Sequence, residues 1–143
     1  MSPELQVYQR QRKQKVDLRW LRRQAMAAVP LCLAECKADD APLALLPELE
    51  VSIISDKQIA QVHADFMGDP TATDVITFHH GEILISADTA ALRGPEHGHE
   101  LGEELLLYLI HGLLHLAGWE DHDPEERAEM HRLQDGILAK LLG

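Results

Sequence analysis

The chain has 143 residues, a formal net charge of −11 at neutral pH and 45% hydrophobic residues. This length and composition are typical of a globular protein, so we expect residues 1–143 to form a single domain. No apolar run reaches the roughly 20 residues needed to cross a bilayer, and the polar, basic N-terminus does not resemble a signal peptide. These features argue against a membrane or secreted protein and favour a cytoplasmic one.

The charge is unevenly distributed along the chain. Residues 1–37 contain eight of the 13 Lys and Arg residues and only three acidic residues, so the remainder is strongly acidic. A local basic patch can make phosphate contacts even in an acidic protein. A solvated strand and helix surface explains the same charges equally well. The candidate RNA-binding patch consists of Arg10, Arg12, Lys13, Lys15, Arg19, Arg22 and Arg23.

Periodicity predicts the first elements. Leu5–Gln9 alternates apolar and polar residues as a half-buried strand does. Asp17 is a plausible N-cap for a helix from Leu18 to Ala34, in which Pro30 should kink or interrupt the hydrogen bonding. The stretch 38–47 is rich in Asp and Pro and is expected to be turns.

The middle of the chain predicts three strands and a helix. Residues 49–54, Leu-Glu-Val-Ser-Ile-Ile, are predicted to form a strand, and Ser55 with Gln58 is a capping box that begins a helix ending near Phe66. Residues 73–78 and 82–86 are predicted strands separated by a short turn.

The last third is predicted to be mostly helical. Residues 88–99 are expected to be mainly loop after a short apolar helix candidate at Thr89–Leu92. His97 and His99 could bind metal, but solvated loop residues are the favoured interpretation. A very apolar helix over residues 100–117 is expected to be buried, and Asp123 caps a final helix. The predicted fold class is therefore α+β, with a small mixed sheet covered by helices and a central apolar helix carrying metal-binding histidines, as in zincin-like folds.

The strongest functional signal lies at the end of this apolar helix. His111 and His115 stand four residues apart, so both side chains lie on one face. Gly118 follows where a helix commonly ends in a left-handed residue, and the chain can then return a third ligand from Asp121 or His122. Three protein ligands and an open position are typical of catalytic zinc. The alternative is a pair of core histidines held by ordinary hydrogen bonds, because buried imidazoles need polar partners in either case.

These residues resemble the YbeY family, bacterial rRNA maturation factors described as metal-dependent endoribonucleases. The family motif H-G-x-L-H-L-x-G-Y-D-H is matched over most of residues 111–118. The upstream family segments T-D-V-L-S-F and G-D-I-x-I correspond to residues 73–78 and 81–85. The resemblance implies one Zn²⁺ ion, an RNA substrate, a role in rRNA maturation and ribosome quality control, and the ribosomal subunit as a partner.

The residue count leaves two candidates for the third ligand, because the segment is one residue longer here than in the family. Asp121 stands ten residues after His111, where the family has its third histidine, and His122 completes the Asp-His pair. Both types of side chain bind zinc. We predict His111, His115 and His122 as metal ligands, with Asp121 as a catalytic or ligand-orienting residue.

A second departure concerns a cationic residue. The family pattern Y-R-G-K reads Phe66-Met67-Gly68-Asp69 here, so Met67 replaces an arginine that would bind phosphate or stabilise developing charge. His79 and His80 lie nearby and are candidates for phosphate contacts.

The predicted reaction is metal-assisted hydrolysis of an RNA phosphodiester. Gly112 occupies the position at which HExxH zinc proteases carry their general-base glutamate, which argues against a peptidase. The base would be the metal hydroxide or Asp121. The alternative is a ribosome-associated assembly factor in which the metal is mainly structural, and the loss of the arginine at Met67 favours it.

Overall fold

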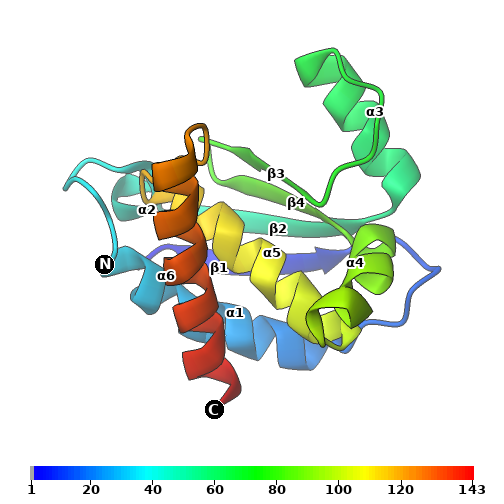
Figure 1. The fold of residues 1–143 in the computed structure, drawn as a ribbon, viewed down its shortest axis with the longest axis horizontal. Helices are drawn as coiled ribbons and strands as arrows, with labels where there is room; N and C mark the ends of the chain where they lie inside the picture. The colour runs from blue at the N-terminus through cyan, green and yellow to red at the C-terminus, as the bar shows by residue number, and fades with distance from the viewer. Residues whose placement is uncertain (1) are drawn as a thin grey trace.

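The computed structural model describes residues 2–143, and within that range four strands form one sheet against a layer of helices (Figure 1). This arrangement confirms the predicted α+β class. In chain order the elements are β1 (Glu4–Gln9), α1 (Leu18–Leu33), α2 (Pro42–Leu45), β2 (Glu48–Ile54), α3 (Asp56–Met67), β3 (Val75–Phe78), β4 (Glu82–Ser86), α4 (Ala87–Arg93), the 3₁₀ helix η1 (Gly94–His97), α5 (Leu101–Leu116) and α6 (Pro124–Leu142).

The sheet has the strand order β1-β2-β4-β3 and is mixed. β1, β2 and β4 run parallel, and β3 pairs antiparallel with β4 through a tight hairpin. Gly81 closes that hairpin with φ +105°, and a Cβ there would lie 2.8 Å from the Glu48 carbonyl oxygen. A residue with a side chain would therefore be strained by its backbone and blocked by β2.

The two faces of the sheet are covered unequally. Ile83 and Ile85 of β4 belong to the main core with α1 and α5, whereas Leu84 packs with Ile76 and with Ile59 of α3 in a smaller cluster. This is the alternation that a strand buried on both faces requires. α5 crosses the main face, with α1 and α6 beside it, and α3 projects at the opposite side (Figure 1).

α5 is the buried helix that the sequence predicted. Eleven of its 16 residues are buried, and Glu104 is among them. An all-round apolar surface of this kind is stable only inside a core. The histidine pair is therefore carried by a helix that is enclosed in the core.

The predicted helix starts are confirmed. Asp17 accepts a hydrogen bond from the Trp20 amide, and Asp123 caps α6 through the Glu126 amide. The Ser55 capping box is complete, because Ser55 accepts from the Gln58 amide while the Gln58 side chain accepts from the Ser55 amide.

Three local predictions need correction. α1 is not interrupted at Pro30, which lies inside the helix. Residues 42–45 form a short helix in the stretch predicted as turns, with Pro42 at its first position, where proline needs no hydrogen-bonded amide. Residues 87–97 are helical rather than mostly loop, because Ser86 caps α4 through the Thr89 amide.

The helices of residues 2–143 include none that is both long and apolar enough to cross a membrane. The prediction that residues 1–143 form one domain stays a prediction.

Candidate metal centre

His111 and His115 converge at the C-terminal end of α5, as their spacing predicts. Their Nε2 atoms lie 3.1 Å apart, and the ring centroids are 4.6 Å apart at an interplanar angle of 86°. Both side chains are largely buried, with 16% and 19% exposure. Two imidazole nitrogens thus share one small, poorly hydrated space.

The other ring nitrogen of each histidine faces an oxygen that can only accept. His111 Nδ1 lies 2.7 Å from Gln134 Oε1 on α6, and His115 Nδ1 lies 2.9 Å from the Trp119 carbonyl oxygen. Each Nδ1 therefore carries the proton and donates, which leaves a lone pair on each Nε2. Burial lowers the pKa of His111, which keeps it neutral. Two facing lone pairs repel one another unless a cation lies between them.

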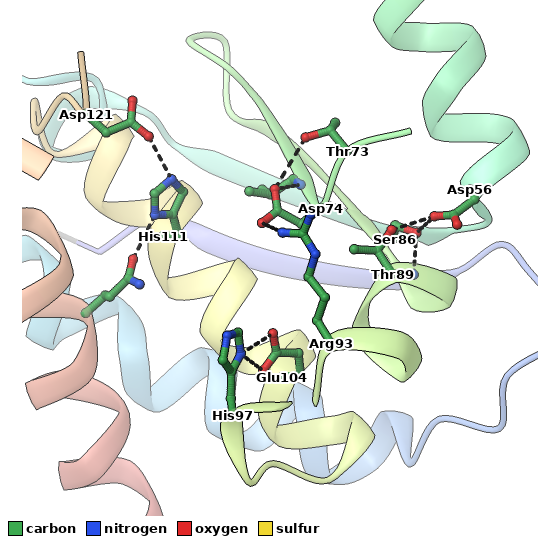
Figure 2. Close-up of polar contacts among 12 residues, drawn as sticks. Asp56, Thr73, Asp74, Ser86, Thr89, Arg93, His97, Glu104, His111 and Asp121 are labelled. Atoms are coloured by element: carbon green, nitrogen blue, oxygen red, sulfur yellow. Dashed lines mark hydrogen bonds and ion pairs between the residues drawn. The ribbon is translucent and has the colours of Figure 1, made fainter. Parts of the chain in front are cut away.

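Asp121 brings a third donor to the same point. Its Oδ2 lies 3.5 Å from His111 Nε2 (Figure 2) and 3.7 Å from His115 Nε2. Ligands at about 2.0–2.1 Å around a tetrahedral zinc ion are about 3.3 Å from one another. The three separations, 3.1, 3.5 and 3.7 Å, bracket that value. The donor set and its spacing therefore fit a small divalent ion.

His122 is not brought to this point. Its side chain is 83% exposed, and its Nε2 lies 3.3 Å from Glu120 Oε2. The geometry therefore favours Asp121 as the third donor over the predicted His122, although both residues line the cavity described below.

The loop after α5 has three anchors. Gly118 has φ +102°, a conformation that favours glycine and lets the chain turn back after the helix. The Trp119 indole donates to the Glu35 carbonyl oxygen at 2.7 Å, and Lys37 lies over its ring. These anchors hold the Trp119 carbonyl against His115 and place the Asp121 carboxylate beside the two imidazoles.

Gly112 lies between the two histidines and faces the sheet. A Cβ at this position would be 2.9 Å from Ile83 Cγ2 and 3.0 Å from Thr77 Oγ1. The glutamate of an HExxH peptidase cannot occupy this site without displacing β4. The structure therefore supports the sequence argument against a peptidase.

The candidate centre opens into a cavity of about 420 Å³. Within residues 2–143 its lining contains no Lys or Arg, so imidazoles are its basic side chains. Met67, at the position of the expected family arginine, lines this cavity, as does His79. His80 is instead 69% exposed, pairs with Glu82 and stacks on Phe78. Of the two predicted phosphate contacts, only His79 lines this cavity.

Asp74 links this cavity to a larger neighbouring one of about 650 Å³. Its carboxylate accepts from the Val75 amide and lies 3.7 Å from Arg93 (Figure 2). His111 lines both cavities. The neighbouring cavity contains the guanidinium of Arg93, but that group is already paired with Asp74.

His97 and His99 are not free in solvent, which corrects the sequence expectation. The Nδ1 atoms of both lie within 3.0 Å of the carboxylate of Glu104, which is fully buried on α5. Figure 2 shows the contact from His97. These three residues are a second group whose donor atoms lie close enough to hold an ion. From the sequence, His97 and His99 were only the weaker of the possible metal ligands, because their buried partner is a glutamate inside an apolar helix.

The basic N-terminal segment is partly occupied by internal contacts. Arg22 donates to the Val7 carbonyl oxygen, Arg10 pairs with Glu50, and Lys13 lies 4.0 Å from Asp88. Such contacts reduce the charge available to an RNA backbone. The patch remains a proposal for the residues that have solvent-facing groups.

The fold and this site define an α+β protein with a buried helix that presents paired histidines and a carboxylate to a cavity. The family model described as Endoribonuclease YbeY matches residues 6–142, and the chain belongs to that family. It is 38% identical over 120 residues to the Endoribonuclease YbeY of Renibacterium salmoninarum, an alignment that covers 71% of this chain and 76% of that protein.

Further comparisons agree. The chain is 35% identical over 105 residues to the Endoribonuclease YbeY of a Synechococcus species, covering 63% of this chain and 66% of that one. The solution structure of TM1509 from Thermotoga maritima is similar with a TM-score of 0.64 and 20% identity, covering 96% of this chain and 88% of that one. At that identity the likeness shows the fold alone.

Proposed function

We propose that this protein is a metal-dependent endoribonuclease that hydrolyses RNA phosphodiesters during rRNA maturation and ribosome quality control in the cytoplasm. Its relatives are named as endoribonucleases. The observation that carries the proposal is the pair of His111 and His115 Nε2 lone pairs 3.1 Å apart, with Asp121 Oδ2 beside them at the edge of a cavity. The resident ion is proposed to be one Zn²⁺, which this donor set suits.

The ligand set that we propose is His111, His115 and Asp121. His122, the third ligand predicted from the motif, can replace Asp121 only if the loop releases its contact with Glu120. Zinc affinity separates the two assignments. Asp121→Ala should weaken zinc binding much more than His122→Ala, and the reverse order would support the histidine.

The remaining chemistry falls to side chains around the cavity. An ion held there would supply a water nucleophile at neutral pH and positive charge for the phosphoryl oxygens. The carboxylate of Glu120 and the imidazole of His122 lie 3.3 Å apart at the rim, so they can accept a proton and release it to solvent. His79, on the opposite wall, is placed to hydrogen-bond to a phosphate oxygen.

The experiment is cleavage of a structured RNA by the purified protein, with and without a chelator. Chelation should abolish cleavage and added zinc should restore it, and His115→Ala should reduce the rate by about 100-fold or more, because it removes one proposed ligand. His131→Ala is a matched control, since His131 is exposed and belongs to neither group of candidate ligands. Cleavage that persists unchanged in His115→Ala would exclude the nuclease proposal.

A second candidate is an assembly factor that binds rRNA or the ribosomal subunit, with a mainly structural ion. Met67 favours it, because a thioether cannot replace a guanidinium at a phosphate. Under this alternative, chelation would unfold the protein rather than only inactivate it. Circular dichroism before and after chelation distinguishes the two: a retained fold with lost cleavage supports the enzyme.

A further inference from the structure

A buried carboxylate on α5 lies away from the His111 site. The Glu104 side chain is 0% exposed, whereas buried carboxylates normally have a partner of opposite charge. His97, from η1, turns its Nδ1 atom toward it at 2.9 Å (Figure 2), and His99, from the following connection, does so at 2.8 Å. Two segments of the chain thus converge on one buried negative charge.

This charge has no Lys or Arg partner within residues 2–143. The nearby Arg93 lies against Asp74 instead. Burial raises the pKa of Glu104, but hydrogen bonds from His97 and His99 more than offset it, so the carboxyl is ionised. His97 and His99 are its ionisable partners among the described residues. A buried carboxylate is stable only when it is paired, hydrogen-bonded or bound to a metal ion.

The hydroxyl of Tyr108 also faces this carboxylate. Tyr108 is 4% exposed, and its hydroxyl helps to hold the pKa of Glu104 down. It lies one helical turn after Glu104 and lines the same 650 Å³ cavity as His97 and His99.

We propose that His97, His99 and Glu104 form a second zinc site, separate from the His111 site. Two imidazoles and one glutamate are a donor set found in catalytic zinc enzymes, and here the donor atoms all lie within 4.8 Å of one another. The two candidate sites share no ligand, so the chain would hold two ions.

When zinc binds through Nδ1, an imidazole that donated from Nδ1 to Glu104 carries its proton on Nε2 instead. The tautomer changes, and no net proton is lost. His97 and His99 line the 650 Å³ cavity, and His111 lines it too. An ion bound by three protein groups keeps a coordination position for water or a phosphate oxygen, and this cavity is the space available to such a ligand.

The experiment counts zinc ions bound per chain, by titrating metal-free protein with Zn²⁺ alone and by elemental analysis after dialysis. The wild type should bind two ions, and His97→Ala and His115→Ala should each bind one. His97 is 47% exposed on its side chain, so its removal should leave the fold intact. His131→Ala, which lies outside both donor sets, should still bind two.

The result separates the two sites. One ion in the wild type, lost in His115→Ala and retained in His97→Ala, would overturn the second site and leave the proposed function standing. One ion lost in His97→Ala but not in His115→Ala would support the second site and contradict the first. Two ions in folded His97→Ala, bound as tightly as in the wild type, would show that Glu104 and its histidines are only a hydrogen-bonded cluster.

Discussion

Replacing Gln134 by leucine should weaken zinc binding without touching a proposed ligand. The Gln134 side chain is 92% buried on α6, and its Oε1 accepts from His111 Nδ1 at 2.7 Å. This bond fixes the tautomer and turns Nε2 toward Asp121. Loss of such an outer hydrogen bond typically reduces metal affinity about 10- to 100-fold, or about 1.4–2.7 kcal/mol. Leucine has a similar volume, so packing against α5 should be kept.

The assay is a zinc competition titration against a chromophoric chelator, with the unfolding free energy measured in parallel on metal-free protein. Without Gln134 Oε1, the buried His111 Nδ1–H has no acceptor, which should also lower the free energy of unfolding by about 1–3 kcal/mol. Gln134→Glu is the matched control, because a carboxylate at the same place still accepts from Nδ1 and should preserve affinity. If folded Gln134→Leu binds zinc within about twofold of the wild type, where a loss of at least 10-fold is expected, the assigned tautomer is wrong.

Three further predictions concern other parts of the molecule. Gly112→Ala should lower the free energy of unfolding, measured in urea, by about 1–2 kcal/mol. The added Cβ would lie 2.9 Å from Ile83 Cγ2, and this overpacking destabilises the core by more than the higher helix propensity of alanine stabilises α5. A more stable variant would contradict this. Met67→Arg should raise the rate of RNA cleavage several-fold by placing a guanidinium in the cavity, whereas the uncharged Met67→Gln should not; equal rates would remove the argument from the missing arginine. The pKa of Glu104 lies below its usual value of 4.5, because hydrogen bonds outweigh burial. Metal-free protein should therefore lose stability as pH falls below about 4.5, and Glu104→Gln should reduce that slope.

The parts of the fold that sequence reasoning predicted are those with strong local signals. The helix starts at Asp17, Ser55 and Asp123 follow from side chains that cap their own backbone. The strands follow from alternation. By contrast, the helix at residues 42–45 has too few residues for any periodicity, and α1 continues through Pro30 because tertiary packing outweighs the lost hydrogen bond.

The candidate metal centre likewise has a part that the sequence predicts and a part that it does not. His111 and His115 could be paired from spacing alone, because helix geometry fixes where residues four apart lie. The third donor could not, because the conformation of the loop after Gly118 decides whether Asp121 or His122 reaches the space between the imidazoles. The role of Gln134 could not be predicted from the sequence either, since it depends on how α6 packs against α5.

The central claim is that two imidazoles and a carboxylate converge on one ion at the end of α5. An anomalous difference map at the zinc edge, from crystals of zinc-loaded protein, tests it most directly. The account predicts a peak about 2.0–2.2 Å from His111 Nε2, His115 Nε2 and an oxygen of Asp121. A fully loaded crystal with no peak between the two imidazoles would contradict it.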